Sequence, residues 1–498
     1  MVSFLVALAA LIVGYLTYGR FVSRVFHPEE DRETPAYTKE DGVDYVPMPT
    51  WKVYMVQFLN IAGLGPIFGA IMGAKFGTAS YLWIVFGCIF AGAVHDYLTS
   101  MVSIRMNGAS LSEIIGAYLG EFARKVMCVF ICVLLILLAA TFVSGPAELL
   151  SAMTSGWGLN AYGWIVIIFL YYVIATLCPV DKIIGNIYPV FAFCLIFMAV
   201  GIGAYLVVAN PGLPELWDGS LVNKEWQSAP VFPMMFITIA CGAISGFHGT
   251  QSPLMARCLK NERMGRRCFY GAMITEGIVA LVWAAAATCF YQDNGVVNPE
   301  TGKAFSGAYI ANFVSNNWLG VAGGILAVLG IAVAPITSGD TALRSARLVV
   351  ADFINFEQKS IWRRLVIAVP IFILTAIALV WSLSDADGFN ILWRYFSWTN
   401  QTLSVFTLWA LSVYMLRAKK LWIIAYLPAI FMTCVCTTYI LVAPEGFQLN
   451  YAFSLTVGIV ASALSENWKK KQGFDCRKFS RLELIPRLTV TQGEEPSL

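Results

Sequence analysis

Four side chains that can bind or release a proton stand inside long apolar runs of the sequence: His95, Asp96, His248 and Glu276. If those runs cross a membrane, such groups are costly there, so they are rare and often mark paths for ions or protons. Histidine suits proton transfer because its unperturbed pKa, about 6.5, lies near neutrality. We therefore expect these residues to be candidates for coupling to a cation gradient. The alternative is that each is a structural hydrogen-bonding group, with Asp96 paired to Arg105.

Two apolar segments are interrupted near mid-length by polar residues and helix breakers. The first, residues 52–75, contains the stretch NIAGLGP from position 60, and the second, residues 232–253, contains GAISGFHGTQ from position 242. Irregular backbone is tolerated at membrane depth only where it faces protein or a water-filled cavity. The two interruptions therefore predict discontinuous helices around a site near the membrane midplane. The alternative for the glycines is close packing between continuous helices.

The composition indicates that membrane-spanning helices position these residues. Only 13% of the 498 residues are charged and 58% are hydrophobic, whereas about 25% charged residues is usual in soluble proteins. The formal net charge is +3, which gives no sign of a nucleic-acid partner. The composition predicts an all-α polytopic membrane protein, with the lipid bilayer as its surroundings.

Thirteen apolar runs are long enough to cross a bilayer, which takes about 20 residues each. The runs are 2–26, 52–75, 79–103, 121–146, 162–181, 186–209, 232–253, 267–290, 318–340, 361–382, 389–416, 421–443 and 449–468. Of the 33 Lys and Arg residues, 29 fall on one side when the loops are assigned alternately. Because loops rich in Lys and Arg stay in the cytoplasm, we expect the N-terminus outside and the C-terminus inside.

The interrupted segments are the first and sixth of ten consecutive spans. Residues 51–210 form one predicted five-helix unit and residues 231–417 a second. Because five is odd, the second unit enters the membrane from the opposite side, which is the arrangement of an inverted repeat. The remaining predicted parts are a helix and cytoplasmic loop in 1–50, two helices in 421–468 and a cytoplasmic tail in 469–498.

This pattern resembles the LeuT-type, 5+5 inverted-repeat fold of the APC transporter superfamily. The stretch NIAGLG from position 60 resembles the unwound part of that fold's first core helix, and APITS from position 334 resembles the stretch where sodium-coupled members bind their cation. The resemblance implies a site made of the carbonyls of Leu59, Ala62 and Ala334 and the hydroxyls of Thr337 and Ser338. Five neutral oxygens suit sodium. The alternative is that both hydroxyls bond back to the preceding helical turn.

Five longer motifs resemble the carbon starvation protein A (CstA) family over nearly all spans. They are GLGPIFGAIMGAKFG (63–77), LWIVFGCIFAGAVHDY (82–97), GASLSEIIG (108–116), SGFHGTQSPLMAR (245–257) and TSGDTALRSARL (337–348). The resemblance implies a bacterial inner-membrane transporter of the carbon starvation and stress response. Family members are linked to peptide uptake and, in one branch, to proton-coupled pyruvate uptake. We expect sodium or a proton as the coupling ion and no other cofactor.

A substrate with a carboxylate, such as pyruvate, an amino acid or a short peptide, would lie beside the two breaks. Pro66 suits the start of the outer half-helix, whose N–H groups from Ile67 to Gly69 would be free and would favour a carboxylate. The expected substrate residues are Gly63, Gly65, Pro66 and Ile67 on the first broken helix, and Ser245, Phe247, His248, Thr250 and Gln251 on the second.

Two further patterns concern the ends of helices. Ser110 and Glu113 have the spacing of a capping box and predict the start of a short helix. Asp340 likewise predicts a capped helix start, and Asp340 with Arg344 is a candidate gating pair.

Three other classes of function compete with a secondary active transporter. A solute channel does not require paired broken helices. An intramembrane enzyme would need a catalytic group, but the chain has three His residues and no H-E-x-x-H motif. A nutrient-sensing receptor would need a signalling domain, and the short segment after Trp468 shows none. We therefore predict a cation-coupled transporter and no enzyme, with pyruvate or peptide, sodium or proton, and the oligomeric state left open.

Overall fold

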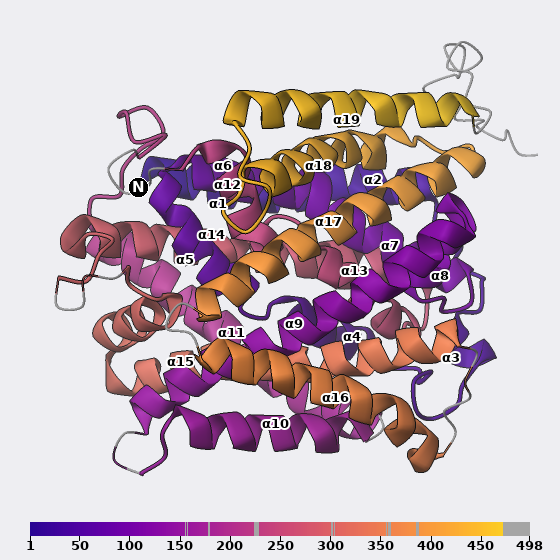
Figure 1. Cartoon of the computed structure of the whole chain (residues 1–498), viewed down its shortest axis with the longest axis horizontal. Coiled ribbons are helices and arrows are strands. Elements are labelled where there is room, and N and C mark those ends of the chain that lie inside the picture. The colour runs from indigo at the N-terminus through magenta and orange to yellow at the C-terminus, as the bar shows by residue number, and fades with distance from the viewer. Residues whose placement is uncertain are drawn as a thin grey trace, which may run out of the picture.

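The computed structural model describes residues 1–471, apart from 155, 157, 178–179, 224–228, 300–301, 303, 355, 357–359 and 385–387. The expected tail beyond residue 471 therefore lies outside the described residues. The regular elements of the described part are helices, labelled as in Figure 1. In the first half they are α1 (Val2–Leu16), α2 (Tyr18–Phe26), α3 (Pro35–Thr38), α4 (Thr50–Ile61), α5 (Ala70–Gly73), α6 (Ala79–Gly87), α7 (Ala93–Arg105), α8 (Leu111–Leu119), α9 (Glu121–Met153), α10 (Ala161–Leu177) and α11 (Val180–Ala209). In the second half they are α12 (Val231–Ile239), α13 (Gly246–Ala256), α14 (Gly271–Asn294), α15 (Gly307–Phe353), α16 (Ile361–Ser384), α17 (Gly388–Arg417), α18 (Ile423–Val442) and α19 (Tyr451–Lys471).

Short π-helical or 3₁₀-helical turns connect several of these helices. They are η1 (Gly65–Gly69), η2 (Ala74–Phe76), η3 (Cys88–Gly92), η5 (Ala240–Gly242), η6 (Glu262–Met264) and η7 (Arg266–Tyr270). Two of these turns, η1 and η5, adjoin the interruptions predicted from the sequence.

Nine helical stretches in the described residues are long and apolar enough to cross a membrane. A tenth is the bent pair of α4 and the segment Gly65–Phe76, whose axes differ by 53°. The other expected spans are helical too, on α10, α17 and α19. The chain is thus a multi-pass helical membrane protein.

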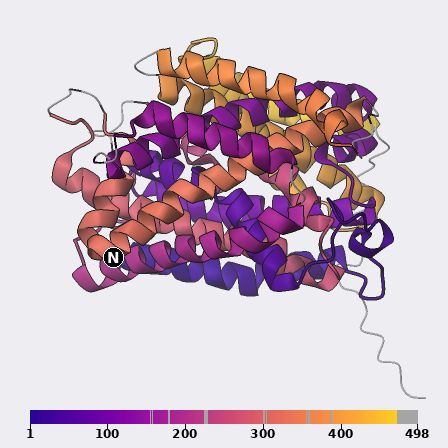
Figure 2. The ribbon, with the colours of Figure 1, turned by 90° about the horizontal axis from the view of Figure 1, so that it is seen from below.

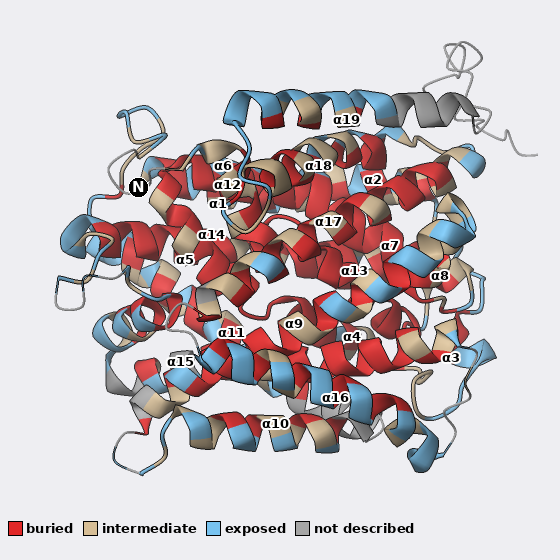
Figure 3. Cartoon of the chain, viewed as in Figure 1, coloured by how far each residue is buried: buried red, intermediate tan, exposed pale blue. Residues whose placement is uncertain are grey.

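The outer helices differ from the central ones in what they expose. In two perpendicular views the long helices run broadly alongside one another (Figure 1, Figure 2). In Figure 1, α19 lies at one edge, and α10 and α16 lie toward the opposite edge. On these edge helices apolar side chains point outward; Ile174 on α10 is 61% exposed and Val380 on α16 is 67% exposed (Figure 3). Apolar side chains at the rim of a membrane protein face lipid, so these surfaces need no protein partner.

The central helices α7 and α13 are buried on all sides. Every residue of α13 is buried, and so is every residue of α7 from Ala93 to Ile104, although both helices carry polar side chains. Polar groups that are buried all round a helix must find partners on neighbouring helices or a ligand. The molecule therefore places its intramembrane polar residues at its centre (Figure 3).

The segment from residue 27 to residue 49, between α2 and α4, packs on the loop that follows α13. Thr34 Oγ1 donates to the carbonyl of Leu259 at 2.5 Å, and the Met48 N–H donates to the carbonyl of Cys258 at 3.1 Å. We call this stretch the 27–49 segment. It fastens the start of the chain to the end of the second broken helix.

The two predicted helix starts had different outcomes. The Ser110 N–H donates to Glu113 Oε2 at 2.7 Å at the start of α8, so the capping box is confirmed. The start at Asp340 is wrong, because Asp340 lies within α15. The non-helical residue in α15 is Gly320, at φ 67°. A local cap preference is overridden here by a continuous membrane helix.

Candidate functional site

The two predicted discontinuous helices are present, and their breaks touch. The first helix stops at Ile61 and resumes at Gly65, and the second stops at η5 and resumes at Gly246. A Cβ atom on Gly65 would lie 2.2 Å from the Cβ of Cys241, so only glycine allows the two backbones to approach this closely. Gly65 therefore also serves close packing, the alternative interpretation of the glycines, because the residue against which it packs belongs to the break in the second helix.

Four of the five groups expected to bind a cation meet where α4 ends. Ser338 Oγ donates a hydrogen bond to the carbonyl of Leu59 or of Ala334, each at 3.0 Å. Thr337 Oγ1 lies 2.8 Å from the carbonyl of Ala334. Thr337 thus bonds back to its own helix, as the alternative supposed, while Ser338 also links α15 to the break. The N–H of Ala62 donates to the carbonyl of Phe58 at 2.9 Å, as the last bond of the first half-helix.

Asn60, next to this group, was not among the expected site residues. Its side chain is fully buried, and neither its amide nitrogen nor its amide oxygen has a hydrogen-bond partner among the described residues. A buried amide without partners is costly, and it points to a ligand that supplies the missing bonds. The sequence signal was present, since Asn60 is the polar residue that precedes the glycines of the break.

The expected substrate residues of the first broken helix lie at the break, but one expectation about them is wrong. The N–H groups of Ile67 and Phe68 are not free, because both donate to the carbonyl of Leu64, at 3.2 and 2.7 Å. The helical turn after the break starts at Leu64 and uses these donors. Gly63 lies against an aromatic ring instead, since a Cβ atom there would be 2.4 Å from Cε2 of Phe142.

On the second broken helix, two residues of α17 form hydrogen bonds with the break and the start of α13. Asn400 Oδ1 accepts hydrogen bonds from Ser245 Oγ at 3.0 Å and from the Phe247 N–H at 2.7 Å. Gln401 Nε2 donates to the carbonyl of Ile244 at 2.8 Å. Ser245 and Phe247 therefore lie at the break as expected, held by two residues that sequence reasoning missed. Their signal was the polar run SWTNQT from position 397 inside an apolar segment.

Thr250 and Gln251 lie farther along α13 and face α15 instead of the break. Gln251 Nε2 lies 3.2 Å from Ser345 Oγ and 2.9 Å from Thr250 Oγ1. Thr250 Oγ1 donates to the carbonyl of Phe247 at 2.7 Å. The Gln251 side chain therefore joins α13 to α15, whereas the Thr250 hydroxyl bonds within α13.

The four ionisable residues expected to be coupling candidates form one buried cluster on α7, α13 and α14. The cluster consists of His95, Asp96, His248 and Glu276, all fully buried. The two oxygens of Asp96 bind two rings, His95 Nδ1 at 2.9 Å and His248 Nδ1 at 3.0 Å. On the other side of its ring, His248 Nε2 lies 3.5 Å from Glu276 Oε2. The expected alternative partner of Asp96, Arg105, instead binds Glu262, at 3.1 Å.

Several nitrogen and oxygen atoms of the cluster have no hydrogen-bond partner among the described residues. His95 Nε2 and both carboxylate oxygens of Glu276 make no hydrogen bond with any described residue. The small residue Gly249 makes room for the first ring, since a Cβ atom there would lie 3.2 Å from Cε1 of His95. Hydrogen bonds connect His95, Asp96 and His248, whereas the 3.5 Å between His248 Nε2 and Glu276 Oε2 must shorten before a proton can pass between them.

The candidate gating residues, Asp340 and Arg344, lie farther along α15 than Ser338. The hydroxyl oxygen of Tyr188 lies 2.8 Å from Asp340 Oδ2 and 3.0 Å from the carbonyl oxygen of Thr337. Arg344 donates to the carbonyl of Ala175 at 2.9 Å, and its other terminal nitrogen lies 3.9 Å from Asp44 Oδ1. Arg344 therefore connects the buried helix α15 to the 27–49 segment.

Comparison with protein families gives a match along most of the chain. The family profile described as "Carbon starvation protein CstA" matches residues 1–159, 148–321 and 301–439. An uncharacterized membrane protein of Haemophilus influenzae is 42% identical over an aligned length of 341, and the match covers 59% of this chain and 92% of that protein.

Two relatives with named activities match over a smaller share of their length. The peptide transporter CstA of Campylobacter jejuni is 28% identical over an aligned length of 377, and the match covers 61% of this chain and 52% of that protein. The pyruvate/proton symporter BtsT of Escherichia coli is 28% identical over an aligned length of 352, and the match covers 57% of this chain and 48% of that protein. The chain thus spans about half the length of these two relatives.

Solved structures with the same fold are also transporters. A manganese transporter of Eremococcus coleocola superposes with a TM-score of 0.56 at 14% identity, covering 88% of this chain and 99% of that one. The nucleobase–cation symporter Mhp1 gives a TM-score of 0.53 at 12% identity, covering 85% and 93%. At these identities the likeness concerns the fold alone, and it confirms the expected LeuT-type architecture.

Proposed function

The chain belongs to the carbon starvation protein CstA family, and from that premise we propose that it is a secondary active transporter that takes up a small carboxylate-bearing nutrient together with a cation. The transporter role, as opposed to an enzymatic one, is supported by the named relatives and by the fold. The coupling ion and the substrate are the proposed part.

The proposal rests on one observation. The second broken helix places a titratable residue between two other titratable residues, which lie on two different helices. His248 is the third residue of α13, directly after the break, and it lies between Asp96 on α7 and Glu276 on α14. A half-helix that pivots at its break would change both distances. Protonation of the cluster and the position of α13 are then linked, which is what coupled transport requires.

We favour a proton as the coupling ion. The cluster offers three kinds of titratable site, and Glu276 has both oxygens free of hydrogen bonds within the described residues. The relative BtsT is named a pyruvate/proton symporter. Sodium is the second candidate, because the hydroxyl of Ser338 lies within hydrogen-bond distance of the carbonyls of Leu59 and Ala334.

For the substrate, we propose pyruvate, an amino acid or a short peptide, the kinds of compound named for the relatives or allied to them. The carboxylate would lie against the amide of Asn60, since the N–H groups of Ile67 and Phe68 are already bonded. Asn60 provides two N–H donors, and a carboxylate accepts both without placing a second charge in the membrane.

The experiment is transport into liposomes that contain the purified protein. Labelled pyruvate, amino acids and short peptides are offered in turn, each with an imposed pH gradient, a sodium gradient or neither. We expect one carboxylate to accumulate above its external concentration under an inward proton gradient, and a protonophore to abolish this. Equilibration without accumulation would indicate a channel, and accumulation under the sodium gradient alone would assign sodium as the coupling ion. Protein-free liposomes are the control.

We further propose that the protein lies in the bacterial inner membrane with its N-terminus outside. The support is the distribution of 29 of 33 cationic residues on alternate loops.

A further inference from the structure

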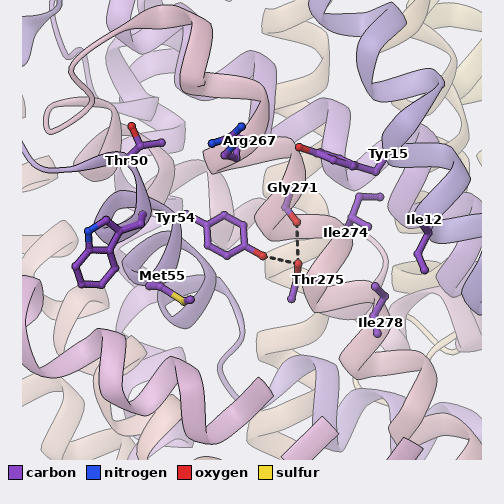
Figure 4. Close-up of a pocket in the computed structure, with 11 residues that line it drawn as sticks. Ile12, Tyr15, Thr50, Tyr54, Met55, Arg267, Gly271, Ile274, Thr275 and Ile278 are labelled. Carbon is purple, nitrogen blue, oxygen red and sulfur yellow. Dashed lines mark hydrogen bonds between the residues drawn. The ribbon is translucent and has the colours of Figure 1, made fainter. Parts of the chain in front are cut away.

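A groove on the molecular surface, between α1, α4 and α14, plays no part in the site described above. It encloses about 440 Å³. Its apolar walls are formed by Ile12 from α1, Met55 from α4, and Ile274 and Ile278 from α14 (Figure 4). Ile12 is 47% exposed, so the groove opens to the surroundings of the helices.

Two hydroxyl groups between the apolar walls of the groove, those of Tyr54 and Thr275, are already bonded. The hydroxyls of Tyr54 and Thr275 share a hydrogen bond of 2.6 Å, and Thr275 Oγ1 also lies 3.1 Å from the carbonyl of Gly271 (Figure 4). Groups that are already bonded in this way do not call for a polar ligand. The wall therefore suits an apolar occupant.

One end of the groove is cationic. Arg267 lines it, is exposed, and makes no hydrogen bond or ion pair with any described residue. The neighbouring guanidinium of Arg266 lies 4.7 Å from the ring centre of Tyr15, which also lines the groove. Trp51, 52% exposed, lies at the same end, where α4 begins. An exposed Trp beside cations is typical of the membrane–water interface.

The length of the groove matches one leaflet of a bilayer. Arg267 on η7 and Ile278 on α14 lie at opposite ends of the wall that these two consecutive elements form, eleven residues apart. At a helical rise of about 1.5 Å per residue this is roughly 16 Å. Half of a hydrocarbon core of about 30 Å is roughly 15 Å. The apolar walls thus extend from the interface to about the midplane.

We propose that this groove binds an anionic phospholipid, with one acyl chain along the apolar walls and its phosphate against Arg267. The choice of occupant follows from the unpaired cation at one end, the satisfied apolar walls and the length of a single leaflet. The expected orientation of the chain places this end at the cytoplasmic leaflet, where anionic lipids meet basic side chains.

The test uses native mass spectrometry of the full-length protein, purified in mild detergent and titrated with phosphatidylglycerol or phosphatidylcholine. We expect the wild-type protein to retain phosphatidylglycerol preferentially. Arg267→Gln should lower its retention about fivefold, since one Arg near an anionic surface contributes about 1 kcal/mol. Ile278→Trp, which fills the apolar end, should lower the retention of both lipids.

The matched control is Arg20→Gln, which removes another exposed cation, on the neighbouring helix α2, outside the groove. It should leave retention unchanged. Equal loss in the Arg20 and Arg267 variants, or no preference for phosphatidylglycerol in the wild-type protein, would overturn the proposal. A stable dimer that the Ile278→Trp variant disrupts, without bound lipid, would assign the groove to a second copy of the chain. None of these outcomes depends on transport activity, so the proposed function stands or falls separately.

Discussion

Asp96 on α7 and His248 on α13 stand 152 positions apart in the chain, yet the carboxylate of one lies 3.0 Å from Nδ1 of the other. This contact fixes the orientation of the imidazole ring, so that Nε2 faces Glu276. The second broken helix is thereby tied to two unbroken elements through a group whose charge depends on protonation.

Glu276→Gln should uncouple transport from the proton gradient. The amide keeps the shape of the side chain but cannot titrate. For one proton per substrate, a gradient of one pH unit sustains about tenfold accumulation, because about 1.4 kcal/mol corresponds to a factor of ten. We expect the variant to reach a concentration ratio near one under that gradient while it still exchanges labelled for unlabelled substrate. Glu121→Gln, at the exposed start of α9, is the control and should behave as wild type. Unchanged accumulation in the Glu276→Gln variant would exclude this carboxylate as the coupling group.

Thr337→Val with Ser338→Ala tests the role of sodium. The two changes remove both hydroxyls next to the end of α4, while the carbonyls of Leu59 and Ala334 stay in place. We expect proton-driven accumulation to persist and any stimulation by sodium to disappear. Uptake is measured in sodium and in choline buffers at the same pH gradient. Sodium stimulation that is equal in the variant and the wild type would rule out a cation site at these hydroxyls.

Asn400→Leu should destabilise the second break. It removes the oxygen that accepts from the Phe247 N–H and from Ser245 Oγ, and it leaves both donors buried. A buried donor left without a partner costs about 1–3 kcal/mol. We expect a lower unfolding temperature in detergent and a larger loss of transport than of stability. Asn317→Leu, an exposed position on α15, is the comparison. If both variants unfold at the wild-type temperature, the hydrogen bonds of Asn400 do not hold the break.

Gly65→Ala should disrupt the contact between the two breaks. The added methyl would lie 2.2 Å from the Cβ of Cys241, so one backbone must move. Overpacking of this kind costs about 1–3 kcal/mol. The double variant with Cys241→Gly restores the space, and we expect it to recover stability and uptake. Gly203→Ala is a control, because a Cβ atom there would meet its nearest neighbour at an ordinary 3.6 Å. Failure of the double variant to recover would mean that this contact is not the cause.

Glu262→Gln should weaken the attachment of the 27–49 segment. The carboxylate of Glu262 is fully buried, accepts two bonds from Arg105 at 3.1 and 3.3 Å, and accepts the Glu29 N–H at 2.9 Å. Removing one partner of a buried ion pair costs about 3–5 kcal/mol. We expect faster proteolysis within the 27–49 segment in the purified variant. The variant Glu30→Gln alters an exposed pair with Arg263 and should have little effect. Similar proteolysis rates in the two variants would contradict this role.

The sequence predicted the spans and both breaks because apolar length, glycine and misplaced polar residues are local properties. It also selected the four residues of the buried cluster, since a titratable group inside an apolar run stands out whatever its partner. It did not predict their order in space, because contacts such as Asp96 with His248 depend on how separate helices pack.

The wrong or missed predictions also arise because local patterns do not show how a segment is continued or what packs against it. Asp340 has the local features of a helix cap, but a continuous membrane helix satisfies its backbone. The N–H of Ile67 was expected to be free, but the turn that starts at Leu64 uses it. Asn400 was missed because the polar run SWTNQT marks its position but does not identify its partner, the start of a helix 153 positions away.

The docking of the 27–49 segment also bears on how the protein is made. Thr34 bonds to a residue 225 positions later in the chain. At about 5–20 residues per second, roughly 10–45 s of synthesis separate the two. Throughout that interval α1 and α2 must enter and hold their place in the membrane without this attachment. Early insertion therefore depends on hydrophobicity and flanking charge, and the attachment forms only after the second broken helix has emerged from the ribosome.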